Sequence, residues 1–529
     1  MTVQITHVTS PELFAGSDDD PRQLLRVELT RSSGDGALSV RVSGDGLSGT
    51  ADLPPGDGPI RVEVPLEIAR PLRSEYGASV RATVTVSAEG REVAADSGTV
   101  VIAEPSWTMV MVSHFHYDPV WWNTQAAYTT SWDLRGADGT TRPVYTHNAF
   151  SLVDAHLKLA LRDPAYCFVL AELDYLKPYF DTFPENRAVL GRLIAEGRVE
   201  IIGGTYNEPN TNLTGAETTI RNIVYGVGYQ RDILGGDPQN AWQLDVFGHD
   251  PQFPGYRAKA GLTGSAWARG PFHQWGPLRQ AWSEPKAGTA AVMQFHSEFE
   301  WISPSGDGVL THYMPDHYGP GWELQHAPSV EAAGDTAYQL FATLKTVAAT
   351  RNTLLPVGGD YTPPNNWITA LHHDWNARYA WPKFVCGTTK HFMDRVRAEL
   401  AAEGRRPSPQ SRDMNPIYTG KDVSYIDTKQ AQRAAEVAAV DAEKLGTYAD
   451  LLGLGRFAEA SLDQVWRQLA YGAHHDAITG SESDQVYIDL VTGWREAHDL
   501  SDAARTARRP SGRRRWSSPT HCRSRGPTW

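Results

Sequence analysis

The first 105 residues alternate apolar and polar positions in short runs. The runs at 24–31, 38–44, 60–68 and 79–88 (for example LSVRVSG and IRVEVPLEI) are separated by stretches rich in Gly, Asp and Pro. A period of two indicates strands with one buried face, and the Gly- and Asp-rich breaks indicate turns. We therefore predict a small β-sandwich over residues 1–105.

At residue 107 the pattern changes to longer apolar runs that alternate with stretches of helical periodicity. The apolar runs lie at 107–112, 167–172, 241–248, 264–270, 291–296 and 352–360. Strands that alternate with helices indicate a parallel sheet covered by helices, either open or closed into a barrel. We predict an α/β domain at residues 106–410, with its ligand chemistry at the carboxyl ends of the strands.

The next region is helical. Residues 428–453, 459–477 and 481–500 carry apolar side chains at spacings of three and four, and short connections join them. Such spacing places the apolar side chains on one face of each helix. We predict a three-helix bundle over residues 411–502.

Composition and charge narrow the class of protein. The chain has 529 residues, more than one ordinary domain, and its formal net charge of −13 argues against nucleic acid as a partner. Its three cysteines, Cys167, Cys386 and Cys522, are too few for a disulfide framework and lack zinc-site spacing. We find neither a secretory signal in residues 1–14 nor a run of about 18 apolar residues that could span a membrane. We expect a soluble cytoplasmic protein with no membrane partner.

The last 27 residues, 503–529, have an unusual composition. They hold eight arginines and no acidic residue, without any periodicity. An RNA-binding arm is one interpretation. A frameshift in GC-rich coding sequence also produces crowded Arg, Pro, Ser and Gly, and we favour it. We expect this tail to be disordered and assign it no function.

The sequence HFHYDPVWW directly follows the first apolar run of the α/β region. His114, His116 and Asp118 alternate, so in extended backbone their side chains share one face. That arrangement suits metal ligation, and the adjacent Trp121 and Trp122 suit contact with a sugar ring. Buried, hydrogen-bonded core histidines explain the same pair equally well.

Two carboxylates end later apolar runs, and a histidine-rich segment ends a predicted helix. Asp245 (in WQLDVFGHD) and Asp360 (in VGGDY) stand where turns begin, so each is either a pocket carboxylate or a turn former. Two strand-end carboxylates in one parallel sheet are what acid–base or glycosidic chemistry requires. His474, His475 and Asp476 (in HHDAITG) lie where the helix dipole favours histidine, yet the combination is uncommon.

Taken together, the blocks HFHYDPVWW, WQLDVFGHD, VGGDY and HHDAITG resemble the signature blocks of the family 38 glycoside hydrolases, the α-mannosidases. Their order and rough spacing match, as does the intervening EGRVEIIGGTYNEPNTNLTGAE, and the resemblance covers about residues 106–500. It implies a retaining α-mannosidase with a (β/α)7-type catalytic domain. The expected partner is a mannose-containing oligosaccharide or glycoside.

The resemblance also implies a metal and a catalytic pair. One divalent metal, most often zinc with cobalt or calcium as alternatives, would be held by His116, Asp118, Asp245 and His475. Two imidazoles and two carboxylates leave room for the sugar hydroxyls on C2 and C3. Asp245 would be the nucleophile of a covalent mannosyl-enzyme. Asp360 would be the acid and base, with a raised pKa and a carboxylate separation of about 5–5.5 Å.

The resemblance further implies five substrate contacts, namely Trp121, Arg269, Tyr318, His474 and Asp476. Trp121 would form a floor for the sugar ring, with Trp122 packed beneath it. Arg269 would stabilise Asp245 as an anion. His114 is not a ligand of the family, so we expect it to be structural or to contact the ligands from outside. No role follows for Glu172 or Glu208, which we expect to form core salt bridges or hydrogen bonds.

This sequence departs from the family pattern at its end. Family members usually continue past the helical region into large β-sandwich domains, whereas this chain ends in the arginine-rich tail. One alternative is therefore a truncated chain that binds glycans without turnover. A metal-dependent amidohydrolase or deacetylase is another, because His-x-His at a strand end also serves those enzymes. Such enzymes need no Asp245 and Asp360 pair. No oligomeric state is predicted.

Overall fold

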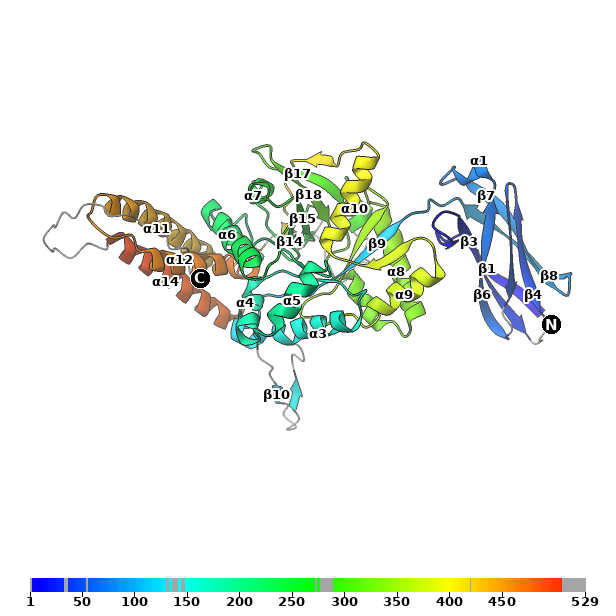
Figure 1. Ribbon diagram of the computed structural model, residues 1–529, viewed down its shortest axis with the longest axis horizontal. Helices are drawn as coiled ribbons and strands as arrows, with labels where there is room; N and C mark the ends of the chain where they lie inside the picture. The colour runs from blue at the N-terminus through cyan, green and yellow to red at the C-terminus, as the bar shows by residue number, and fades with distance from the viewer. Residues whose placement is uncertain are drawn as a thin grey trace.

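The computed structural model describes residues 2–32, 37–53, 56–129, 133–135, 141–143, 148–271, 274–275, 289–418 and 420–506. Along the longest axis, an antiparallel β region lies at one end, a mixed α/β region in the middle and a group of long helices at the other end (Figure 1). The blocks that we expect to carry chemistry lie in the middle region and at its border with the helices.

The N-terminal region is one antiparallel sheet. Its strands are β1 (Thr2–Thr9), β2 (Phe14–Gly16), β3 (Pro21–Ser32), β4 (Leu38–Gly44), β5 (Leu47–Leu53), β6 (Gly58–Ile68), β7 (Ser79–Ala88) and β8 (Arg91–Val101), with α1 (Arg70–Arg73) between β6 and β7. They pair in the order β1-β3-β6-β5-β4-β7-β8, and β2 lies beside β3. Their alternating apolar side chains, such as Val40, Val64 and Val84, are fully buried.

The predicted antiparallel strands are thus confirmed, but they do not form two separate stacked sheets. The long strand β6 pairs with β3 through its first part and with β5 through its last residues, so the hydrogen bonding continues without a break. β1 also contacts β8. The sheet therefore curls into a nearly closed form.

Strand β9 (Thr108–Ser113) is the centre of the first parallel sheet. All six of its residues are buried. Its parallel partners are β12 (Phe168–Leu170), β19 (Asn352–Val357) and β20 (Lys383–Cys386), and β13 (Val199–Ile201) lies beyond β12. Strands buried on both faces read as continuous apolar runs, which explains the pattern at 107–112.

A second sheet continues from the first. It contains the parallel strands β14 (Asn240–Gln243), β15 (Gly264–Trp267) and β18 (Gly308–Tyr313), then β17 (Glu298–Ile302) and β21 (Ser408–Gln410). The Gly203 amide donates to the Asn240 carbonyl and joins the two sheets. The prediction of parallel strands is confirmed. The strand expected at 291–296 is wrong, because the 3-10 helix η1 (Thr289–Val292) occupies its start and β17 begins only at Glu298.

Helices cover the parallel strands. They are α2 (Gln125–Thr129), α3 (Ala149–Arg162), α4 (Leu173–Thr182), α5 (Asn186–Ala195), α6 (Ala216–Asp232), α7 (Phe253–Lys259), η2 (Pro320–His326), α8 (Val330–Lys345), α9 (Ile368–Arg378) and α10 (Thr389–Ala402). Asn148, Ser329 and Thr388 begin three of these helices, and each side chain accepts a backbone N–H of the first turn. Two short pairs complete the region: β10 (Asp133–Arg135) with β11 (Thr141–Pro143), and β16 (Gln274–Trp275) with β22 (Ile417–Tyr418).

The C-terminal region is helical, as predicted. Its elements are α11 (Ile426–Leu451), α12 (Glu459–Gly472), α13 (His475–Thr479) and α14 (Asp484–Thr506). α11, α12 and α14 contact one another through a shared core that includes Ala439, Leu469 and Trp494. α14 continues to Thr506, four residues past the predicted boundary, and the rest of the arginine-rich tail lies outside the described residues. Within the described parts, no helix has the length and apolar character needed to cross a membrane.

One predicted helix differs from the structure in a way that matters for the site. We expected a continuous helix over 459–477, but α12 ends at Gly472 and the short helix α13 starts at His475. The backbone between them leaves the helix because the Asn210 amide donates to the Ala473 carbonyl, and Pro209 bridges to His474. The histidine-rich segment is therefore bound to the α/β region.

Candidate active site

The site forms where parallel strands end. The block 114–118 follows β9, Asp245 follows β14, and Asp360 follows β19. The His116 amide donates to the Gly359 carbonyl at 2.9 Å, which extends the β9 and β19 pairing to the site. Because the carboxyl ends of parallel strands meet at one edge, residues distant in sequence come together there. The turn between α12 and α13 adds the histidine-rich segment from the helical side.

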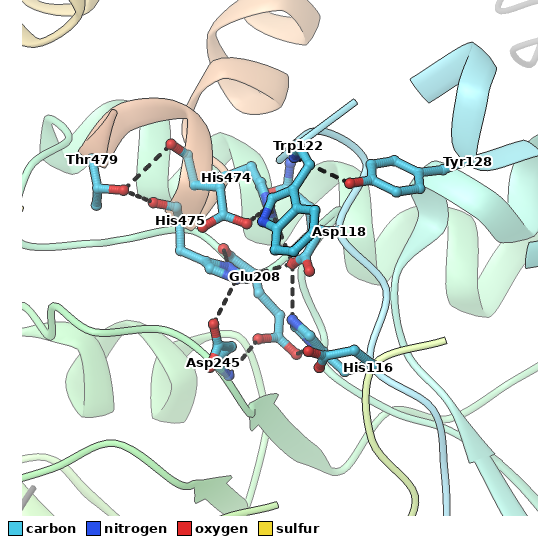
Figure 2. Close-up of polar contacts among 12 residues, drawn as sticks. His116, Asp118, Trp122, Tyr128, Glu208, Asp245, His474, His475 and Thr479 are labelled. Carbon is cyan, nitrogen blue, oxygen red and sulfur yellow. Dashed lines mark hydrogen bonds and ion pairs between the residues drawn. The ribbon is translucent and has the colours of Figure 1, made fainter. Parts of the chain in front are cut away.

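The four residues expected to bind a metal lie together (Figure 2). Oδ1 of Asp118 is 2.8 Å from Nε2 of His116 and 3.1 Å from Nε2 of His475. Nε2 of His475 is 3.7 Å from Oδ2 of Asp245. One potential ligand atom from each of His116, Asp245 and His475 lies within 4.8 Å of the others.

The donor atoms of this cluster fit a divalent cation. Nε2 of His116, Oδ1 of Asp118 and Nε2 of His475 are buried, and among the described residues they have no hydrogen-bond partner outside this cluster. Buried polar atoms are almost always hydrogen-bonded or ligated, so three that converge on one another without other partners indicate an ion site. Two imidazoles and two carboxylates form a donor set that zinc accepts.

The electrostatics of the cluster also favour a cation. Burial alone would raise the pKa of Asp118, but His116 and the hydrogen bonds from His474 and His475 hold it well below its usual range. Burial alone would lower the pKa of His116, whereas Asp118 and Glu208 raise it well above its usual range. The same carboxylates that attract a proton to His116 attract a metal cation in its place.

Asp245 forms an ion pair with Arg269. Nε of Arg269 donates to Oδ1 of Asp245 at 2.6 Å, Nη2 contacts the same oxygen, and Nη1 contacts the Tyr418 hydroxyl. Burial disfavours the charge on Arg269, yet Asp245 and Tyr418 raise the pKa of this guanidinium above its usual value. The contact expected from the sequence therefore exists, and it leaves Oδ2 of Asp245 directed at the cluster.

Asp360 is an exposed residue of the site, as a group that exchanges protons with water must be. The protein around it still desolvates the carboxyl and raises its pKa. His116 opposes that shift, and the carboxylates of Asp118 and Asp245 add to it. The Tyr318 hydroxyl donates to Oδ1 of Asp360 at 2.9 Å.

The remaining predicted contacts surround the cluster. Nε2 of His474 is 3.5 Å from Oδ1 of Asp118 and 3.6 Å from Oδ2 of Asp476. Trp121 is half-buried, and its carbonyl accepts the Ser483 N–H at 2.9 Å. The ring of Trp122 contacts that of Trp121, with centroids 4.8 Å apart. Trp122 is 62% exposed, so the expected contact exists but Trp122 is not buried beneath Trp121.

His114 lies apart from the ligand set. It is fully buried, and its Nε2 is 2.9 Å from the Tyr318 carbonyl. Burial lowers the pKa of His114 to about 4, so the ring is neutral near pH 7. These contacts agree with the structural role expected from the sequence.

Three residues belong to the site without having been assigned a role. The Tyr361 hydroxyl accepts the Asp118 N–H at 3.2 Å and donates to the Asp118 carbonyl at 2.8 Å. Glu208 contacts several of the expected ligands, and Tyr418 contacts Arg269. The position of Glu208 near the end of a strand run was the one signal in the sequence. No local pattern marks Tyr418, which the β16 and β22 pair brings in.

The chain matches two family descriptions. "Glycosyl hydrolases family 38 N-terminal domain" matches residues 106–421, and "Alpha mannosidase middle domain" matches residues 417–507. The first match covers more than half of the chain and contains every predicted ligand except the late histidine, which lies in the second.

Individual relatives are distant. "Alpha-mannosidase 2" of Drosophila melanogaster is 20% identical over 435 residues, which cover 73% of this chain and 37% of the relative. "Putative mannosylglycerate hydrolase" of Halalkalibacterium halodurans is 23% identical over 404 residues, which cover 73% of this chain and 40% of the relative. The chain thus spans well under half the length of the curated relatives it matches.

A solved structure shows the same fold. An α-mannosidase from Enterococcus faecalis V583 superposes with a TM-score of 0.59 at 20% identity, over 75% of this chain and 42% of that one. A second family 38 structure from Enterococcus faecalis superposes with a TM-score of 0.54 at 18% identity, over 76% and 40% of the two chains.

Proposed function

Because the chain belongs to glycosyl hydrolase family 38, we propose that it is a retaining α-mannosidase. The observation that carries the proposal is Asp245 itself. This carboxylate is held by Arg269 on one oxygen and faces His475 with the other, in one site with Asp360. A deacetylase that activates water on a metal needs no such pair of carboxylates.

The proposed metal site consists of four residues. His116, Asp118, Asp245 and His475 would hold one divalent ion, with zinc the best match to two imidazoles and two carboxylates, and cobalt or calcium as alternatives. When bound, the ion supplies Lewis-acid contacts to the vicinal hydroxyls of a mannosyl ring. The unpartnered atoms of this cluster support the assignment.

Two carboxylates carry out the proposed reaction. Asp245 attacks the anomeric carbon, the bond to the leaving oxygen breaks, and Asp360 gives its proton to that oxygen. In the second step Asp360 takes a proton from water, and the resulting hydroxide displaces Asp245 and restores its carboxylate. Tyr318 donates to Oδ1 of Asp360, so the transferred proton resides on Oδ2.

We assign the mannosyl ring to the space in front of Trp121, whose indole offers an apolar face. His474, Asp476 and Tyr318 lie close enough to the ligand cluster to contact sugar hydroxyls. The substrate class is a mannose-containing oligosaccharide or glycoside. The names of the relatives, α-mannosidases and a mannosylglycerate hydrolase, share only the mannosyl unit and support that class.

The proposal extends to the domain plan. We propose a β domain at 1–105, a (β/α)7-type catalytic domain at 106–410 and a three-helix bundle at 411–502. The parallel pairing around β9 and β15 and the mutual contacts of α11, α12 and α14 support this division. A cytoplasmic location remains part of the proposal.

Hydrolysis of an aryl α-mannoside tests the reaction class. The chain is treated with chelator, then assayed before and after zinc, cobalt or calcium is added back. We expect turnover that only the added metal restores. Asp245→Gly should be inactive and should regain product formation, as the glycosyl azide, when azide is supplied. Metal-dependent release of acetate from an N-acetyl sugar by Asp245→Gly would overturn the proposal. Mannose binding by the metal-loaded chain without any turnover would replace it with a glycan-binding role.

A further inference from the structure

Glu208 is a buried carboxylate that the proposed reaction does not use. It lies in the loop that follows β13, and only 1% of its surface is exposed. An unpaired carboxylate is costly to bury, so a carboxylate at this depth is paired with a cation or hydrogen-bonded. Its neighbours come from three separate segments of the site (Figure 2).

The backbone of Glu208 orients His475. The Glu208 carbonyl accepts the His475 N–H at 3.1 Å and lies 3.0 Å from Nδ1 of the same ring. A carbonyl only accepts, so Nδ1 carries the hydrogen and Nε2 carries the lone pair. Nε2 is the atom that faces Asp118 and Asp245.

The side chain of Glu208 orients two further ligands. Oε2 accepts the Asp245 N–H at 3.2 Å, which holds the backbone of the nucleophile. Oε1 lies 3.6 Å from Nδ1 of His116, while Nε2 of that ring faces Asp118. A carboxylate beside Nδ1 favours the tautomer with hydrogen on Nδ1, so the lone pair again points into the cluster.

We propose that Glu208 is the positioning residue of the metal centre, which sets the ligand tautomers of His116 and His475 and holds Asp245 in register with them. This inference rests on the proposed function, because it concerns the same metal. In this proposal the side chain and the backbone carbonyl of Glu208 align three ligands. These are His116 after β9, Asp245 after β14 and His475 after the α12–α13 turn. Residues outside the ligand set that orient a ligating histidine commonly contribute 10–100-fold to metal affinity.

Glu208→Gln isolates the side-chain part of this role. The amide retains an oxygen that can accept the Asp245 N–H and leaves the backbone carbonyl in place. It presents an NH2 group to Nδ1 of His116, which favours the tautomer with hydrogen on Nε2. Glu208→Asp keeps the charge but withdraws it by one methylene. We therefore expect Gln to weaken metal binding more than Asp does.

Glu200→Gln is the matched control. Glu200 is also a buried glutamate in this segment, in β13, and Asn240 and the Lys390 amide donate to its carboxylate. It contacts none of the expected ligands. The same substitution there reports the general effect of neutralising a buried glutamate.

Zinc affinity is measured on the full chain by competition with a chromophoric chelator. Visible absorption of the cobalt-loaded protein and the melting temperature of the metal-free protein are recorded alongside. We expect a zinc dissociation constant about 10–100-fold higher for Glu208→Gln, a smaller increase for Glu208→Asp and a change within about threefold for Glu200→Gln. The cobalt spectrum should change only in the Glu208 variants. If Glu208→Gln does not fold, Glu208→Asp alone decides the question.

Equal zinc affinity and an unchanged cobalt spectrum in both Glu208 variants would overturn the inference. So would two zinc ions per wild-type chain with loss of one in Glu208→Gln, because Glu172 and Glu208 would then be ligands of a second ion with His116. A wild-type chain that binds zinc but does not hydrolyse mannosides would refute the proposed reaction and leave this test intact. A wild-type chain that binds no divalent metal would refute both.

Discussion

Removal of one hydroxyl, in Tyr318→Phe, should move the pH profile of the enzyme in a direction that is easy to refute. The Tyr318 hydroxyl donates to Oδ1 of Asp360 at 2.9 Å, and this hydrogen bond lowers the pKa of that carboxyl against the upward effect of burial. Without the hydroxyl, the carboxylate form loses its donor and the pKa of Asp360 rises further. Because Asp360 must be protonated to donate, activity should persist to higher pH.

The size of the shift follows from the hydrogen bond. A hydrogen bond to a charged group is worth roughly 1.5–3 kcal/mol when buried, and one pKa unit is about 1.4 kcal/mol. Asp360 is accessible to solvent, so water replaces part of the lost contact. We therefore expect the basic limb of kcat/KM to move upward by about 0.5–1.5 pH units.

The assay is kcat/KM for an aryl α-mannoside across the pH range at saturating metal. The position of the limb is independent of any loss of rate at the plateau, so weaker substrate contact does not obscure it. Tyr361→Phe is the control, because the Tyr361 hydroxyl bonds the Asp118 backbone and not Asp360. A limb that stays in place or moves to lower pH in Tyr318→Phe would refute the assignment of Asp360 as the acid.

Three further perturbations test other parts of the structure. Arg269→Met removes the partly buried partner of Asp245, a loss that typically costs about 3–5 kcal/mol. The melting temperature should therefore fall, and kcat should fall about 10²–10³-fold; a variant with wild-type kcat would refute the role of Arg269. Gly358→Ala places a Cβ about 2.0 Å from the His114 carbonyl, and such overpacking costs about 1–3 kcal/mol. The clash should separate the ends of β9 and β19 and lower zinc affinity, which chelator competition measures. Trp494→Ala empties the core shared by α11, α12 and α14 and should destabilise the chain by about 3–5 kcal/mol in denaturant titrations; a loss under 1 kcal/mol would mean that the helices do not share a core.

Much of the architecture could be predicted from local pattern. The period of two before residue 105, the apolar run at 107–112 and the helical spacing after 428 each report burial in the element that carries them. Side-chain burial repeats with the period of the backbone, so the type of an element and its buried face can be predicted from the sequence without knowledge of its neighbours. The location of candidate chemistry at strand ends followed from the same logic.

Local pattern did not predict how strands pair or where helices break. The apolar run at 291–296 resembles a strand, yet a 3-10 turn occupies its start and β17 begins at Glu298. The helix expected over 459–477 breaks after Gly472, because the loop around Pro209 hydrogen-bonds Ala473 and bridges to His474. Both outcomes depend on hydrogen-bond partners from elsewhere in the chain.

The sequence by itself determined the candidate residues, because His116, Asp118, Asp245, Asp360 and His475 stand in recognisable blocks. Only the tertiary structure decided what joins these blocks: the Glu208 carboxylate between His116 and Asp245, its carbonyl on His475, and the Tyr318 hydroxyl on Asp360. The type of a residue determines which bonds its side chain can make. Which bonds form depends on distances of about 3 Å between segments far apart in the chain, and packing of the whole fold sets those distances.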